Sequence, residues 1–209
     1  SHGIYRPLDG ELRQLAEMIG SAERITVFCG IGAREAHDEV VRLAAMLKAP
    51  VAYTFKAKME VQYDNPYEIG MTGLLGLPSA YGAMHESDLL LLLGTDFPYD
   101  CFLPSECRIA QVDIRPERIG RRARVELGLA GDVKETLQAL FPMLRERSDR
   151  VFLDRQLKIY GALCDDMAAV ASKRGSAGNI APEYVATLID TLASDSAIFT
   201  VDTGMCCVW

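Results

Sequence analysis

The stretch DLLLLLGTDFP, residues 88–98, places five consecutive leucines in front of a glycine turn. A short apolar run bounded by turn residues is typical of a strand buried on both faces, as at the centre of a parallel sheet. In open sheets of this kind, ligands bind beyond the carboxyl ends of the strands. Because Gly94 to Pro98 follow at that end, this stretch predicts both the fold class and the place of a site.

The segments on either side repeat an alternation of strand and helix. Strands are expected at 24–29, 51–54, 88–93, 108–114 and 128–132, and helices at 9–20, 35–48, 79–86 and 133–147. This alternation predicts an α/β fold with a doubly wound, Rossmann-like parallel sheet and helices on both faces. Residues 56–78 are expected to be irregular, and so long an irregular stretch inside a compact domain is usually functional.

The length of 209 residues allows one large domain or one domain with additional pieces, and the composition is that of a globular protein. Residues 1–3 are expected to be a cloning scar, 4–147 a central nucleotide-binding domain, 148–179 a helical linker and 180–209 the beginning of another α/β domain. That last segment predicts one helix and one strand, which ends in the turn Asp202-Thr203-Gly204. One helix and one strand cannot bury a core alone, so the segment is expected to be truncated.

Charge and cysteine usage exclude several classes of protein. A net charge of -7 argues against a nucleic-acid surface, which needs clustered Lys and Arg. No apolar run reaches the roughly 20 residues of a membrane span, so we expect no membrane contact from this chain. The six cysteines form no C-x-x-C pair and only one His lies near any of them, so we expect no metal site. The pattern favours reduced thiols in a cytoplasmic protein.

Three turns follow predicted strands and are candidates for ligand contact. The glycines of Gly30 to Ala33 would let a phosphate approach a helix N-terminus, although Glu35 occupies the third glycine position of the dinucleotide fingerprint and a tight turn without ligand explains the pair nearly as well. Gly94 to Pro98 offer backbone N–H groups and a hydroxyl, or simply leave the strand. Asp113 could accept hydrogen bonds from a ribose, or cap the turn before a proline.

Two further segments keep two interpretations each. Residues 71–76 (MTGLLG) could lie along a flat ligand or plug the core. The arginine run of Arg118, Arg121, Arg122 and Arg124 could bind phosphates, although a solvated face is the stronger expectation. The residues provide no plausible catalytic set, so no catalytic residue is predicted. From the residues alone, the chain is a nucleotide-binding domain of undetermined ligand.

Four stretches give the sequence a family resemblance, namely VQYDNPYEIGMTGLLG (61–76), LLLLGTDFPYDCFLP (90–104), AQVDIRPERIG (110–120) and LAGDVKETLQAL (129–140). With these, the chain closely resembles the thiamine-diphosphate-dependent pyruvate oxidases that contain flavin, especially those of the pyruvate:quinone oxidoreductase type. The resemblance runs from about Ile4 to Trp209. It implies a central FAD-binding domain of the DHS-like NAD/FAD-binding fold, followed by the truncated start of the C-terminal thiamine-diphosphate domain.

The resemblance also implies which residues contact the cofactor. Thr72, Gly73, Leu74 and Leu75 match a segment that lines the flavin, and Gly94, Thr95, Asp96, Phe97 and Pro98 match a turn that binds the FAD phosphates and ribitol. The adenosine half is implied at Asp113 and Asp132, and the dinucleotide also lies beside the first glycine turn with Gly30, Gly32 and Ala33.

The implied parent enzyme is an oxidoreductase that converts pyruvate to acetate and CO₂. The resemblance implies FAD in this domain, and thiamine diphosphate with magnesium at sites that lie outside this chain. The fragment itself is therefore expected to be a flavoprotein domain without decarboxylase activity. Its expected partners are FAD and the other domains and subunits of a homo-oligomeric parent that is cytoplasmic or peripherally associated with the membrane.

Three alternatives remain open from the sequence. The parent could be a thiamine-diphosphate decarboxylase or carboligase whose middle domain binds ADP or no ligand. An NAD-dependent deacylase of sirtuin type has a related fold, but the chain lacks the paired C-x-x-C zinc site and a catalytic histidine context. A pure assembly module, which self-associates through exposed apolar surface, is the third.

Overall fold

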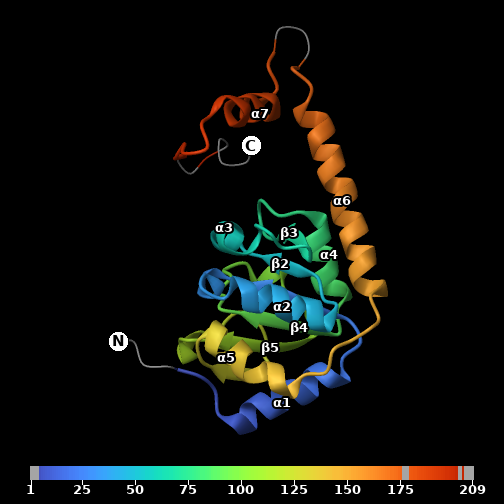
Figure 1. Ribbon diagram of the computed structural model, residues 1–209, viewed down its shortest axis with the longest axis vertical. Coiled ribbons are helices and arrows are strands. Elements are labelled where there is room, and N and C mark those ends of the chain that lie inside the picture. Colours follow the sequence, from blue (N-terminus) through green and yellow to red (C-terminus); the bar gives the residue numbers. More distant parts are fainter. Residues whose placement is uncertain (1–4, 176–178, 202–203, 205–209) are drawn as a thin grey trace. The chain divides into compact units, whose positions relative to one another are not determined.

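The computed structural model describes residues 5–175, 179–201 and 204 of the 209-residue chain. The chain divides into two compact units, Ser1–Lys158 and Ile159–Trp209, each described here by itself (Figure 1). The expected cloning scar at 1–3, most of the expected turn at 202–204 and the cysteine pair at 206–207 lie outside the described residues.

A six-stranded sheet forms the centre of the first unit, and every neighbouring pair of strands in it is parallel. The strands are β1 (Ile25–Cys29), β2 (Val51–Tyr53), β3 (Glu68–Met71), β4 (Leu89–Leu93), β5 (Arg108–Asp113) and β6 (Leu127–Ala130). Their order is β3-β2-β1-β4-β5-β6. The predicted doubly wound α/β fold is confirmed, and the chain reverses its direction of winding between β1 and β4.

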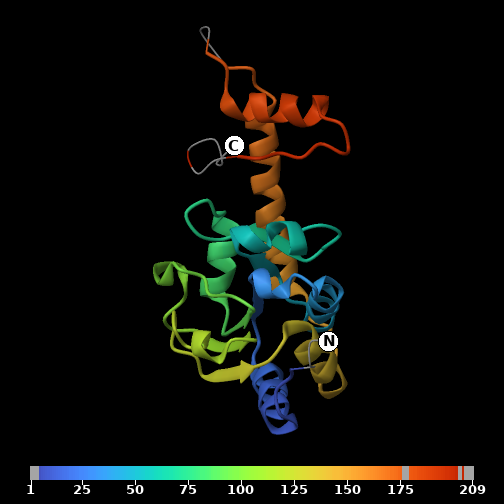
Figure 2. The same ribbon diagram turned by 90° about the vertical axis from the view of Figure 1, so that its left-hand side faces the viewer.

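Helices cover both faces of this sheet (Figure 2). On one face, α1 (Asp9–Ser21), α2 (His37–Leu47) and α5 (Val133–Leu140) pack together and share one hydrophobic core with the sheet. On the other face lies α4 (Pro78–Glu86), where the Thr26 hydroxyl of β1 donates to the Ala83 carbonyl at 3.2 Å. All residues of β1 and β4 are buried because each strand is covered on both sides, as their continuous apolar runs predict.

The stretch 56–78, which the sequence predicts as irregular, contains regular structure, so that prediction is wrong for residues 56–61 and 68–71. A short 3₁₀ turn (Phe55–Ala57), α3 (Lys58–Val61) and β3 occupy it. Pairing with β2 stabilises β3, and the Ser79 hydroxyl donates to the Ile69 carbonyl at 2.7 Å. A strand of four residues with a glycine inside it has no local signal of its own, since its partner supplies its stability.

The second unit contains most of α6 (Val151–Ala171) and all of α7 (Pro182–Leu192). Pro182 starts α7, as its position near the first turn predicts. The strand expected before Asp202 is absent from the described residues 196–201, which carry no strand assignment. A strand needs a hydrogen-bonded neighbour, and none pairs with this segment among the described residues.

The Asp88 carboxylate links the residues just before β1 to the start of β4. The Asp88 carboxylate accepts hydrogen bonds from the backbone N–H of Glu23 at 3.0 Å and of Arg24 at 2.9 Å. The Asp88 N–H in turn donates to the Arg24 carbonyl at 3.0 Å. The two central strands therefore start in a fixed register.

We expect Asp88→Ala to lower the free energy of unfolding by about 1–3 kcal/mol, because two backbone donors lose their charged acceptor. Urea denaturation followed by circular dichroism measures the loss. Asp165→Ala, at an exposed position of α6, is the matched control and should change stability by less than about 0.5 kcal/mol. Equal stabilities of the two variants would contradict the bridging role.

Candidate functional site

The turns after β1 and β4 meet at the switch point of the sheet through their backbones. Gly30 N–H donates to the Leu93 carbonyl at 2.8 Å, and Gly32 N–H donates to the Gly94 carbonyl at 3.0 Å. A Cβ atom on Gly30 would lie 2.4 Å from the Gly94 carbonyl oxygen. The glycines are therefore required for the contact between the two turns, and Ala33 is buried directly beneath them.

The loop after β3 joins the same place. A Cβ atom on Gly73, whose φ is +116°, would lie 3.2 Å from the Phe97 ring, and one on Gly76 would lie 2.5 Å from the Thr72 Cα. The two segments for which the resemblance implies flavin contact, 72–75 and 94–98, are thus in contact with each other. Within them, Leu74 is exposed, Leu75 is half-buried and Pro98 is exposed.

Two threonine hydroxyls at this place are buried without a hydrogen-bond partner among the described residues. They are the Oγ1 atoms of Thr72 and Thr95, and each residue is only 4% exposed. A buried hydroxyl without a partner costs free energy, and such a group in a native structure calls for an explanation. Both atoms belong to segments for which the resemblance implies contact with FAD.

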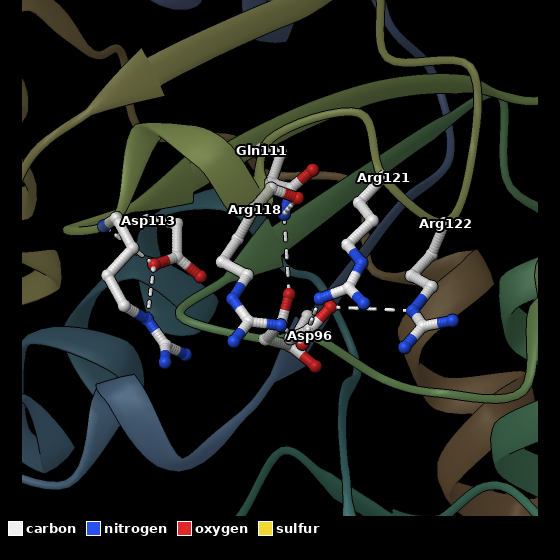
Figure 3. A network of polar contacts seen from close by, with 8 residues as sticks. Asp96, Gln111, Asp113, Arg118, Arg121 and Arg122 are labelled. Atoms are coloured by element: carbon white, nitrogen blue, oxygen red, sulfur yellow. Dashed lines mark hydrogen bonds and ion pairs between the residues drawn. The ribbon is translucent and has the colours of Figure 1, made fainter.

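A cluster of charges lies one strand further along the sheet (Figure 3). The Asp96 carboxylate contacts Arg118 through Oδ2, Arg121 at 3.6 Å and Arg122 at 3.4 Å. All three arginines come from the loop after β5. We call Asp96, Arg118, Arg121 and Arg122 the Asp96–arginine cluster.

Gln111 of β5 fastens this loop to the β4 turn. Its side-chain Nε2 donates to the carbonyls of Thr95 and Arg118, both at 3.3 Å. Its Oε1 accepts from the Gly120 N–H at 2.9 Å. Gln111 is itself 4% exposed, so this polar side chain is buried only because its amide is satisfied on both sides.

Asp113 ends β5 beside this cluster and is 2% exposed. Its Oδ1 accepts from the Arg115 N–H at 2.9 Å and lies 3.8 Å from the Arg115 Nε. Burial raises the pKa of Asp113 above its usual value, while the hydrogen bond and the charge of Arg115 oppose that rise. A second acceptor oxygen remains on this carboxylate, which leaves it able to accept from a ligand hydroxyl.

Asp132 follows β6, directly after Gly131, whose N–H donates to the Asp113 carbonyl at 3.0 Å. Its side chain caps α5 by accepting from the Glu135 N–H at 3.1 Å, and its backbone N–H donates to the Tyr5 carbonyl at 2.8 Å. The structure therefore gives Asp132 a capping role. Its predicted contact with the adenosine half stays a prediction.

The structure brings most of the predicted site residues to the carboxyl ends of the strands. It also shows contacts between side chains that the sequence did not predict. Arg118, Arg121 and Arg122 were expected to form a solvated face, yet they converge on one carboxylate. Their spacing gives no sign of this, because the contact depends on which strand lies beside β5. The buried Gln111 does have a local signal, because it is a polar residue inside an apolar strand.

The described part of the chain offers neither a cluster of metal ligands nor a helix that could cross a membrane. No group of three or more His, Cys, Asp or Glu side chains in it could hold a metal ion. Among its helices, none is both long and apolar enough to cross a membrane.

Comparisons with known proteins bear on the family. Residues 12–140 match the family model described as "Thiamine pyrophosphate enzyme, central domain". An uncharacterized 42.6 kDa protein from Pseudomonas amyloderamosa is 49% identical over 157 residues, which is 75% of this chain and 40% of that protein.

Two relatives with named activities match nearly the whole chain. An acetolactate synthase from Mycobacterium avium is 28% identical over 98% of this chain and 34% of its own length. A pyruvate oxidase from Lactiplantibacillus plantarum is 25% identical over 91% of this chain and 32% of its own length. The chain spans two fifths or less of the length of these relatives.

Proposed function

This chain belongs to the thiamine pyrophosphate enzymes, whose central domain it contains, and from that premise we propose that it is the FAD-binding domain of a pyruvate oxidase of the quinone-linked type. The whole parent would oxidise pyruvate to acetate and CO₂ with thiamine diphosphate, magnesium and FAD. The observation that supports this proposal most is the contact between the loop at 72–76 and the turn at 94–98. These are the two segments for which the resemblance implies contact with a flavin.

The residues at the switch point fit such a dinucleotide. The turns at 30–33 and 94–95 would border a diphosphate, as glycine turns do beyond parallel strands. The N–H groups of Gly30, Gly32, Ala33 and Gly94 already donate to protein carbonyls, so these four groups would not bind it. The buried hydroxyls of Thr72 and Thr95 would gain acceptors. The free oxygen of Asp113 would accept from ribose hydroxyls. FAD, when bound, supplies the electron transfer, and the domain orients it.

The alternative is a parent that joins or cleaves 2-oxo acids without using a flavin for electron transfer. The similarity to an acetolactate synthase, which extends over as much of the chain as the similarity to a pyruvate oxidase, supports this candidate equally. In that case the domain would bind ADP or no ligand. Nucleotide preference separates the ADP-binding and ligand-free forms of this alternative from the proposed flavin domain.

A competitive titration tests the proposal. We expect FAD to bind the purified chain saturably, with quenching of flavin fluorescence, and to be displaced by ADP but not by NAD. Binding of ADP without FAD would favour the ADP-binding alternative, and the absence of both would favour the ligand-free one. The same titration on the full-length parent shows whether flavin binding needs the neighbouring domains.

Asp113→Asn is expected to weaken FAD binding about tenfold or more, because a hydrogen bond to a charged acceptor is worth about 1.5–3 kcal/mol. Glu117→Gln, at an exposed position of the same loop, should leave FAD affinity unchanged. Calorimetry on the two variants measures both. Equal FAD affinities of Asp113→Asn and the wild type would show that the Asp113 carboxylate does not contribute to FAD binding.

The stability of Asp113→Asn distinguishes lost binding from lost folding. Because the pKa of Asp113 is higher in the folded state than in the unfolded chain, the wild type loses stability as the pH rises through the folded pKa. The asparagine variant has no charge to bury and lacks this loss. We therefore expect its melting temperature at pH 7 to equal or exceed that of the wild type, while its FAD affinity falls.

A further inference from the structure

The Asp96–arginine cluster holds more positive charge than its carboxylate can balance. Three guanidinium groups contact one aspartate. Asp113 pairs with Arg115 nearby, and Glu117 is the next acidic residue of the loop. When Arg115, Asp113 and Glu117 are counted with the cluster, the arginines still outnumber the acidic residues, so a positive excess remains. Such an excess beyond the carboxyl ends of β4 and β5 favours an anionic ligand.

The arginines are positioned rather than freely solvated. The side chains of Arg118 and Arg122 are 27% and 32% exposed, and that of Asp96 is 19% exposed. Gln111 holds the loop at the Arg118 carbonyl and at the Gly120 N–H. Figure 3 shows the three guanidinium groups side by side around the Asp96 carboxylate. A face of mobile surface arginines would lack both the shared carboxylate and the buried amide.

The cluster also keeps unused hydrogen-bond donors. Each guanidinium presents several N–H donors in a planar fork. A single carboxylate cannot accept from all the donors of three such groups. The Arg118 Nε is buried and has no partner in the described part of the chain. Arg121 contacts Asp96 only at 3.6 Å, which is beyond a hydrogen bond. Planar forks of this kind match phosphate oxygens well.

We propose that Arg121 and Arg122, positioned by Asp96 and Gln111, recognise the phosphates of a nucleoside diphosphate at this edge of the sheet. The domain then distinguishes a phosphorylated nucleotide from the bare nucleoside through side chains, in addition to any backbone contact at the glycine turns. The place of the adenosine half rests on the proposed function, whereas the recognition of phosphate by the arginines does not.

The test compares three probes on the purified chain by isothermal titration calorimetry, namely ADP, adenosine and inorganic pyrophosphate. The double variant Arg121→Gln/Arg122→Gln should weaken ADP and pyrophosphate at least tenfold and change adenosine affinity by less than twofold. Arg124→Gln, an exposed arginine of the same loop, is the matched control and should change none of the three. Raising the salt concentration should weaken ADP in the wild type more steeply than in the double variant.

The outcomes separate this inference from the proposed function. An equal loss of ADP and adenosine would mean that the arginines only hold the loop, which overturns the inference, as would an unchanged ADP affinity. Binding of pyrophosphate that the double variant abolishes, without any binding of ADP or FAD, would overturn the nucleoside diphosphate as the ligand and contradict the proposed function, while it would show that the arginines bind phosphate. Failure of both ADP and pyrophosphate to bind the wild type would overturn the inference. Thermal denaturation of each variant confirms that it is folded.

Discussion

Gly94→Ala is expected to lower the free energy of unfolding by about 2–5 kcal/mol. Two costs add at this position. The φ of Gly94 is +61°, a left-handed conformation that costs an L-residue about 1–2 kcal/mol. The new Cβ would also lie 2.6 Å from the Gly32 Cα, and overpacking against backbone costs about 1–3 kcal/mol because backbone cannot rotate away.

Two other glycines separate these costs. Gly120 has a φ of +73° and no described atom within 4 Å of its Cβ position, so Gly120→Ala should carry the conformational cost alone. Gly82 lies inside α4 with the same free space and an ordinary φ, so Gly82→Ala should be neutral or stabilising by up to about 1 kcal/mol.

We expect urea denaturation to show the largest loss in the free energy of unfolding for Gly94→Ala, a smaller loss for Gly120→Ala and the smallest for Gly82→Ala. A Gly94 variant that loses no more than the Gly120 variant would mean that the turns after β1 and β4 can separate. In that case the close contact at the switch point would be dispensable for the fold.

Arg147→Ala is expected to have the second largest effect, a loss of roughly 2–3 kcal/mol in the free energy of unfolding. The Arg147 guanidinium donates to the Ile19 carbonyl at 2.5 Å, the Ala22 carbonyl at 2.8 Å and the Glu23 carbonyl at 3.3 Å. The first of these is an end carbonyl of α1, which also accepts from the N–H of the C-cap residue Ala22 at 3.3 Å. The truncation leaves these acceptors without their charged donor and detaches the segment after α5 from α1.

The geometry of the guanidinium gives this prediction a sharp control. Arg147→Lys keeps the charge but not the planar fork, so it should recover only part of the lost stability. Arg145→Ala, an exposed arginine two residues earlier, should change stability by less than about 0.5 kcal/mol. Full recovery by lysine would show that the charge alone stabilises the end of α1.

The central strands of the fold could be predicted from the sequence because burial on both faces leaves a continuous apolar run. The leucines of β4 and the residues of β1 give that signal without any neighbour. β3 gives no such signal, since four residues stabilised by β2 and by Ser79 look irregular on their own. The missed strand was therefore the one that depends most on its partners.

The candidate site divides in the same way. The glycine turns could be found because glycine is required where backbones touch, and that requirement is local to Gly30 and Gly94. The grouping of the arginines around Asp96 could not be found, because it depends on β4 and β5 being neighbours and on Gln111 holding the loop. The burial of Asp113 likewise depends on the elements packed around the end of β5.

The strand order has a consequence for how the chain reaches this structure. β1 pairs along one edge with β4, and α2, β2, α3, β3 and α4 all lie between them in the sequence. Contacts between such distant segments raise the contact order, and closing so long a loop slows folding. On the ribosome, β1 emerges long before its central neighbour is synthesised. One edge of the most apolar part of the sheet therefore stays open while residues 30–88 are synthesised, and during that interval the nascent chain is most exposed to aggregation.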